Sequence, residues 1–164
     1  MKIYISGKIG EEVISDATRR KFAKAEETLR AKGYDVFNPT DKKWEEHLKK
    51  QYKTDHMKDG PWLNGTFPDF YGYALLRDLM ILSTLDAVLM LDDWKKSPGA
   101  QLEQKFAKAV GKRIFYSRYQ DAENVLWEEF CSLPEADHLS LSVGCEKAKE
   151  YTERHLDEHY IPLV

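Results

Sequence analysis

The stretch from residue 87 to residue 111 limits the fold more than any other part of the chain. Residues 87–91 are all apolar, and the sequence Ser97-Pro98-Gly99-Ala100-Gln101-Leu102-Glu103 follows shortly after them. Apolar side chains then recur at helical spacing, at Leu102, Phe106 and Val110, until Gly111. This pattern predicts a strand, a corner and a helix in that order. In open parallel sheets, ligands bind outside the carboxyl ends of the strands, where such corners lie.

Glu103 is the candidate carboxylate of this corner. We expect it near the first turn of the helix, where the macrodipole and the free backbone N–H groups favour an ionised carboxylate. A nucleophilic carboxylate has to be ionised. Helix starts attract acidic residues in general, so the alternative is an acid on a solvated helix face. Position alone leaves both interpretations open.

Short strand patterns alternate with helical patterns over much of the chain. Strands are predicted over 2–6, 34–37, 86–91 and 113–117, and helices over 16–32, 44–53, 73–85 and from the corner to residue 110. A strand, a crossover helix and a second strand place the two strands parallel and give a right-handed connection. We therefore predict an α/β fold with a doubly wound, flavodoxin- or Rossmann-like parallel sheet of strand order 2-1-3-4. That order brings the loop 7–10 beside the corner 97–103.

The length of 164 residues fits a single domain over 1–164. Its parts are a core over 1–118, an aromatic-rich insertion over 40–72 and a helical C-terminal extension over 119–164. The insertion holds six large aromatic residues: Trp44, Tyr52, Trp62, Phe67, Phe70 and Tyr71. It is either a lid whose rings stack on a planar ligand, or a loop packed on its own domain. The extension, with helices predicted near 122–130 and 145–160, either covers the sheet edge or pairs subunits.

Composition excludes several classes of protein. With 25 basic and 28 acidic residues the net charge is -3, which favours neither a nucleic acid polymer nor an anionic membrane as partner. Cys131 and Cys145 form no metal-binding spacing, and a reducing, cytoplasmic location is expected. His155 and His159 stand four residues apart, but no third ligand accompanies them, so we expect no metal. No cofactor is indicated.

Four motifs together resemble one enzyme superfamily. They are Tyr4-Ile5-Ser6-Gly7-Lys8-Ile9-Gly10, Arg77-Asp78-Leu79, the strand 86–91, and the corner 97–103. In this order they resemble the nucleoside 2-deoxyribosyltransferase superfamily, which includes the 2′-deoxynucleoside 5′-phosphate N-hydrolases. The resemblance covers roughly residues 1–117, without the aromatic insertion. It implies cleavage of an N-glycosidic bond within a doubly wound α/β domain.

The resemblance also implies roles for three residues. Glu103 matches the glutamate that attacks the anomeric carbon and forms a glycosyl-enzyme intermediate. Asp78 matches an aspartate that contacts the sugar and helps to protonate the leaving base, although on sequence alone it is equally a solvent-facing charge. Tyr4 matches a tyrosine that orients the glutamate. A positioned carboxylate and a second acid suit an oxocarbenium-like transition state.

Substrate-binding residues are expected in two loops and at the end of the fourth strand. They are Gly7, Lys8, Ile9, Gly10, Ser97, Gly99 and Ser117. In having serine at position 97 the chain resembles the 5′-phosphate hydrolases, because the transferases tend to carry an acidic residue there. A serine hydroxyl and backbone N–H groups can donate to a phosphate, whereas a carboxylate repels it. Lys8 adds a positive charge, and Glu11 opposes it.

The predicted function is therefore cleavage of a (deoxy)nucleoside 5′-monophosphate through an intermediate on Glu103. Two alternatives stay open: a nucleoside 2-deoxyribosyltransferase that exchanges bases, and a non-catalytic nucleotide-binding module on the same fold. The expected partner is a small nucleoside or nucleotide. The resemblance also implies a homodimer or a larger homo-oligomer, because sites of this superfamily are commonly completed by a neighbouring subunit.

Overall fold

A parallel sheet of four strands forms the centre of the computed structural model, which describes residues 1–10, 13–56, 68–136 and 139–163. The strands are β1 (Lys2–Ser6), β2 (Asp35–Phe37), β3 (Ala87–Met90) and β4 (Arg113–Tyr116). Their order is β2-β1-β3-β4, and all three pairings are parallel. The predicted α/β class and strand order are confirmed.

The strands β1, β3 and β4 end together on one side of the sheet. Ser6 pairs with Met90, and Met90 pairs with Tyr116. The carboxyl ends of β1 and β3 are therefore neighbours. This register places the loop after β1 beside the corner after β3, as the strand order predicts.

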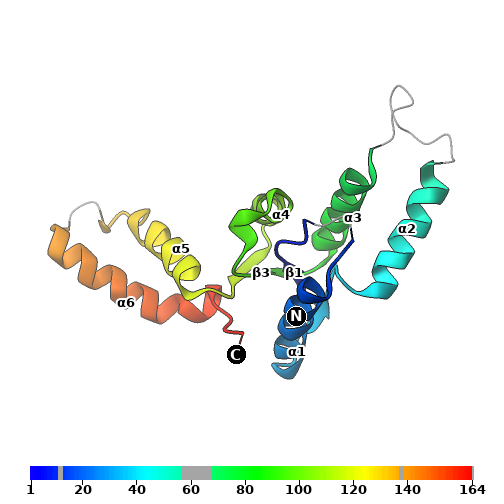
Figure 1. The fold of residues 1–164 in the computed structure, drawn as a ribbon. Helices are drawn as coiled ribbons and strands as arrows, with labels where there is room; N and C mark the ends of the chain where they lie inside the picture. Colours follow the sequence, from blue (N-terminus) through cyan, green and yellow to red (C-terminus); the bar gives the residue numbers. More distant parts are fainter. Residues whose placement is uncertain (11–12, 57–67, 137–138, 164) are drawn as a thin grey trace.

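Helices cover both faces of the sheet (Figure 1). On one face, α1 (Asp16–Ala31) packs Phe22 and Leu29 against Ile3 and Ile5 of β1. On the other face, α3 (Phe70–Thr84) and α4 (Pro98–Ala109) pack against Tyr4, Val88 and Met90. Successive side chains of a strand point to opposite faces, so β1 supplies both cores.

The insertion contributes helix to the fold at both of its ends. The helix α2 (Lys42–His56) is longer than the predicted 44–53, and α3 begins at Phe70 rather than at residue 73. The earlier start of α3 is explained by Asp69, whose side chain accepts a hydrogen bond of 2.7 Å from the Gly72 N–H. The predicted irregular segment, including Trp62 and Phe67, largely lies outside the described residues.

Two further helices follow β4 and extend away from the sheet (Figure 1). They are α5 (Tyr119–Cys131) and α6 (Leu141–His159), which pack on each other and begin earlier than predicted. After α6 the chain returns to the sheet, where the Ile161 N–H donates to the Tyr116 carbonyl at 3.0 Å. This segment covers part of the β4 edge. Within the described ranges, no helix is both long enough and apolar enough to span a bilayer.

Candidate active site

Glu103 lies on the face of α4 that packs against the sheet. Ser97 caps this helix, because its Oγ accepts a hydrogen bond of 3.3 Å from the Ala100 N–H, and Pro98 is the first helical residue. Glu103 therefore sits in the second turn, not the first turn that we expected. It shares a face with Ala100 and Ala107, both buried, and is itself only 6 % exposed. The alternative of an acid on a solvated helix face is wrong for this reason.

Two hydroxyl groups of β1 hold the Glu103 carboxylate. The Tyr4 hydroxyl donates to Oε1 at 2.8 Å, and the Ser6 hydroxyl donates to Oε2 at 2.5 Å. Tyr4 and Ser6 are two residues apart on one strand, so both point to the same face of the sheet. Ser6 was not among the site residues predicted from the sequence. The alternation of side chains along a strand puts Ser6 on the same face as Tyr4, two residues closer to the carboxyl end of β1, and could have identified it.

Burial raises the pKa of Glu103 to about 7, although the hydrogen bonds from Ser6 and Tyr4 oppose the rise. We expected the helix start to favour the ionised form. That effect falls off beyond the first turn, and Glu103 lies past it, in surroundings that penalise a charge. The group consequently titrates near neutral pH, where a nucleophile or general base is most useful.

Asp78 brings a second acid to the same place from α3. Its Oδ1 is buried and has no hydrogen-bond partner among the described residues. Burial raises the pKa of Asp78 well above its usual range, and the charge of Glu103 raises it further. The Trp44 indole and the Tyr4 hydroxyl oppose this rise, so both lie close enough to interact with the carboxylate. The alternative of a solvent-facing charge does not hold for Oδ1.

Both acids line a cavity of about 590 Å³ at the carboxyl ends of β1 and β3. Part of its lining comes from the loop after β1 and from the start of α4: Gly7, Ile9, Gly10, Ser97, Gly99 and Ala100. A Cβ on Gly7 would lie 3.0 Å from the Leu91 side chain, which would have to shift to admit it. Gly10 has a φ of +52°, in the region that favours glycine. Both ends of this loop therefore favour glycine.

The insertion and α3 supply most of an apolar wall. It consists of Pro39, Trp44, Leu48, Phe70, Tyr71, Ala74 and Leu75. Its aromatic residues were predicted to contact a ligand only as one of two alternatives for the insertion, and its aliphatic residues were not predicted. Trp44 packs edge-on against Phe37, with ring centroids 5.2 Å apart, and Phe37 stacks on Tyr4 at 5.6 Å. Which residues of α2 and α3 face the cavity depends on how these helices pack in the folded protein, so the local sequence pattern did not identify them. Glu45 also lines the cavity, but it is paired with Arg19 and Lys49.

The chain matches the family described as Domain of unknown function (DUF4406) over residues 1–60 and 67–116. The chain belongs to this family. A search of curated proteins gives no match. Among solved structures, this DUF4406 chain matches a 2-deoxyribosyltransferase from Bacillus psychrosaccharolyticus with 19% sequence identity and a TM-score of 0.44, over 71% of each chain. A likeness this distant assigns no function.

Three residues expected at the site of this DUF4406 protein, Tyr4, Lys8 and Ser117, are not among those that line the cavity. Tyr4 acts on the site through its hydrogen bond to Glu103. The Lys8 N–H donates to Asp93 at 3.0 Å and its carbonyl accepts from Lys21 at 2.8 Å, so the backbone of Lys8 fixes the loop. The Ser117 hydroxyl donates to Asp92 at 2.5 Å. Glu11 lies outside the described residues.

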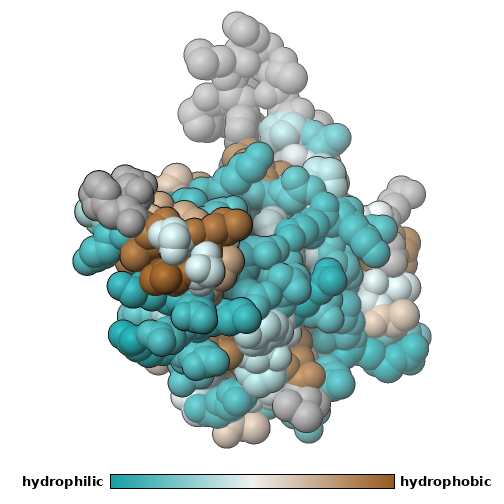
Figure 2. Space-filling view, turned by 90° about the vertical axis from the view of Figure 1, so that its left-hand side faces the viewer, coloured by the Kyte–Doolittle hydropathy of each residue, from teal (hydrophilic) through white to brown (hydrophobic). Residues whose placement is uncertain are grey.

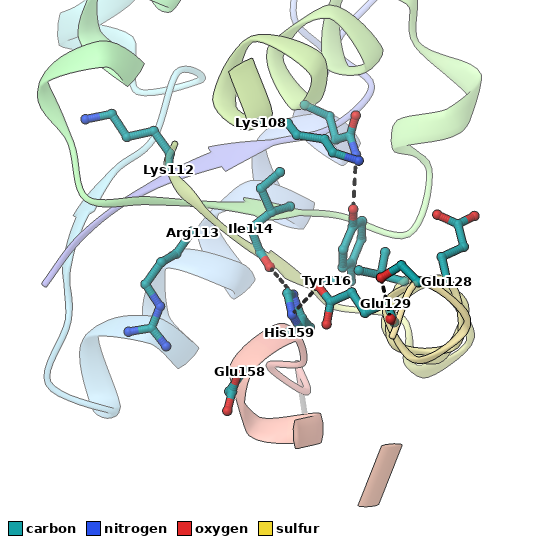
Figure 3. A pocket seen from close by; sticks show the side chains of 12 residues that line it. Lys108, Lys112, Arg113, Ile114, Tyr116, Glu128, Glu129, Glu158 and His159 are labelled. Atoms are coloured by element: carbon teal, nitrogen blue, oxygen red, sulfur yellow. Dashed lines mark hydrogen bonds and ion pairs between the residues drawn. The ribbon is translucent and has the colours of Figure 1, made fainter. Parts of the chain in front are cut away.

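A larger cavity of about 830 Å³ separates α4 and β4 from the α5–α6 pair (Figure 3). Lys108, Lys112 and Arg113 line it together with several glutamates. His159 joins its walls, with its Nε2 3.2 Å from Glu129 and its Nδ1 3.3 Å from the Ile114 carbonyl. Its charged groups are exposed or half-buried, and none of the acids that line it is buried as Glu103 is. The smaller cavity is therefore the candidate active site of this DUF4406 protein.

Proposed function

We propose that this protein cleaves the N-glycosidic bond of a (deoxy)nucleoside 5′-monophosphate, with Glu103 as the nucleophile. The observation that carries the proposal is a pair of acids in one cavity with unequal surroundings: Glu103 is buried, and Asp78 is half-buried with its Oδ1 enclosed. Glu103 accepts hydrogen bonds from Tyr4 and Ser6, whereas Asp78 Oδ1 accepts none from the described residues. Two acids whose surroundings differ take different roles. The two donors favour the ionised form of Glu103, and the resulting charge favours a protonated Asp78.

The proposed reaction has two steps. First, a Glu103 oxygen attacks the anomeric carbon of the sugar. The bond from this carbon to the base breaks, its electron pair stays with the base, and Asp78 transfers its proton to the base. Second, water attacks the same carbon, a water proton returns to Asp78, and the ester to Glu103 breaks. This division of labour is that of retaining glycosidases.

The shape of the cavity supports a nucleotide as substrate. Trp44, Phe70 and Tyr71 offer aromatic surface for a planar base. Ser97 and Gly99 bring the N-terminus of α4 to the same cavity, where a Cβ on Gly99 would lie 3.1 Å from the Tyr71 hydroxyl. Free backbone N–H groups at a helix N-terminus favour an anion such as a 5′-phosphate, and the uncharged Ser97 does not repel it.

A homodimer or larger homo-oligomer is part of this proposal. Tyr71 lines the cavity and is nevertheless 58% exposed. Leu76 and Met80, further along α3, are exposed as well. Burying Tyr71 against a second copy would cover its part of the cavity wall and help to exclude water from the reaction. Sedimentation or light scattering of the purified chain tests this part directly.

The test of the proposed activity is release of free base. Purified protein is incubated with deoxy- and ribonucleoside 5′-monophosphates and with the matching nucleosides, and free base is measured by chromatography. We expect release from monophosphates by the wild type and loss of release in Glu103→Ala. Base exchange that needs a second base would identify a transferase instead. Binding without any release at high protein concentration would contradict the proposal.

A further inference from the structure

Two buried polar atoms of the cavity wall have no partner among the described residues. They are the Trp44 indole Nε1 and Asp78 Oδ1. Arg77 Nε is also unpartnered, but Arg77 does not line the cavity. A buried donor or acceptor without a partner is costly and calls for an explanation. Both Trp44 and Asp78 line the candidate active site, and the Trp44 indole lies close enough to interact with the Asp78 carboxylate. The two groups are therefore neighbours that a bound ligand can contact together.

The position of the Trp44 ring is closely defined. Its backbone N–H donates to Asp41 Oδ1 at 3.2 Å in the first turn of α2. Its ring packs edge-on against Phe37, which stacks in turn on Tyr4. Tyr4 is the residue that donates to Glu103. The indole N–H is thus held by the same set of contacts that positions the proposed nucleophile.

We propose that Trp44 determines which base is cleaved: its indole N–H and the Asp78 carboxyl group bind two neighbouring acceptor atoms on the leaving base. This inference rests on the proposed function. An indole N–H can only donate. Asp78 also donates while it carries the proton that the reaction requires, and the charge of Glu103 and burial both favour that state. Tyr4, which donates to Glu103, is the other titratable group near Asp78.

Two neighbouring donors suit a purine that carries a carbonyl oxygen at C6. Its N7 and O6 are adjacent acceptors. In this arrangement Asp78 transfers its proton to N7, the electron pair of the C1′–N9 bond stays with the base, and Trp44 donates to O6. Adenine has an amino group in place of O6, so the Trp44 N–H would face another donor. The expected substrates are therefore guanine and hypoxanthine nucleotides.

The test compares Trp44→Phe with the wild type on three substrates. These are the deoxynucleoside 5′-monophosphates of guanine, adenine and 2-aminopurine, which is guanine without O6. Trp44→Phe keeps an aromatic ring against Phe37 but removes the N–H. Because a neutral hydrogen bond is worth about tenfold in an equilibrium or rate, we expect kcat/KM for guanine to fall about tenfold. The other two substrates should change by less than about threefold. Comparing variant and wild type on each substrate cancels the different intrinsic reactivity of the bases.

Trp127→Phe is the matched control, because Trp127 lies on α5 outside the cavity and is 45% exposed. It should leave all three values unchanged. Equal losses on all substrates in Trp44→Phe would overturn the inference while leaving the proposed function intact. If Trp44→Phe does not fold, wild-type kcat/KM for guanine and 2-aminopurine decides, each divided by the rate of uncatalysed hydrolysis of the same substrate: equal ratios overturn the inference. Absence of base release from every substrate would instead contradict the proposed function.

Discussion

Glu103 is a carboxylate that the fold buries and then partly stabilises in its charged form. Burial disfavours its ionisation, while the hydroxyl groups of Tyr4 and Ser6 favour it. The balance leaves a pKa of about 7 in place of 4.5. A single group thus links the stability of the protein to its proposed activity, and both should vary over the same range of pH.

Replacing Glu103 by glutamine should stabilise the protein at neutral and alkaline pH. The pKa of Glu103 is about 7 in the folded protein and about 4.5 in the unfolded chain. Between these pH values the unfolded chain ionises Glu103 more readily than the folded protein does, so the wild type loses stability as the pH rises. Glutamine does not titrate. The gain of Glu103→Gln over the wild type should therefore grow between pH 5 and pH 8 by up to about 3 kcal/mol. Urea unfolding at both pH values measures it, and an equal difference at both would contradict the assignment.

Removing the Ser6 hydroxyl should shift the pH dependence of base release. Ser6→Ala takes away a donor that stabilises the ionised form of Glu103, so the pKa of Glu103 should rise further. Hydrogen bonds to charged groups are worth about 1.5–3 kcal/mol, or about one to two pH units. The acidic limb of kcat/KM should move upward by that amount. In Ser132→Ala, whose hydroxyl donates to the Glu129 carbonyl away from the cavity, the limb should stay in place. A loss in Ser6→Ala that is uniform across pH would argue against this role.

At the scale of elements, the start of α4 belongs both to the fold and to the candidate active site. Ser97 caps the helix and also lines the cavity. Aspartate would serve equally well as a cap, but its charge would repel a 5′-phosphate. Substitutions at position 97 therefore distinguish the role of the side chain as a helix cap from its proposed role in selecting the substrate.

We expect Ser97→Asp to keep its stability to within about 0.5 kcal/mol, while Ser97→Ala loses about 1 kcal/mol through loss of the cap. With 5′-monophosphates, Ser97→Asp should lose at least about tenfold in kcat/KM, because a carboxylate opposes a phosphate. With free nucleosides it should change little. Thermal unfolding and base-release assays on both substrate classes provide the comparison. Equal losses on nucleosides and monophosphates would show that the phosphate does not lie at Ser97.

The sequence predicted the elements better than it predicted the walls of the site. Runs such as 87–91 and the helical spacing of Phe22 and Leu29 are local patterns, and the strand order followed from crossover geometry. The position of Glu103 in the second turn depended on where the helix begins, which is the least certain feature of such patterns. The wall formed by Trp44 and Phe70 arises from packing of α2 and α3 around the cavity, and no local pattern records that contact.

At the scale of the whole molecule, α5 and α6 form a pair beyond the β4 edge, and the segment after them returns to the sheet. Figure 2 views the molecule from this side and shows one apolar patch on a mainly hydrophilic face. The exposed large apolar residues of the two helices are Tyr119, Trp127, Leu141 and Val143. Ile161, by contrast, is buried in the core cluster that contains Ile3 and Phe22. The end of the described chain therefore takes part in the core beneath the sheet.

Ile161→Ala should lower the free energy of unfolding by about 2–4 kcal/mol, because it removes buried methyl groups and leaves a cavity in a packed core. Leu141→Ala is the control: this side chain is 88% exposed, so the change should stay within about 0.5 kcal/mol. Chemical denaturation of both variants measures the difference. If the two substitutions cost the same, the return of the chain to the core would not contribute to stability.

The covalent bond to Glu103 is the central claim, and trapping it is the most direct test. The wild type is mixed briefly with a nucleoside 5′-monophosphate whose sugar carries fluorine at C2′, which slows breakdown of a glycosyl intermediate. It is then quenched and analysed by intact-protein and peptide mass spectrometry. We predict a mass increase equal to that of the fluorinated sugar phosphate. It should be located on the peptide that contains Glu103 and should be missing in Glu103→Gln. Release of base without any adduct, or an adduct on another residue, would contradict it.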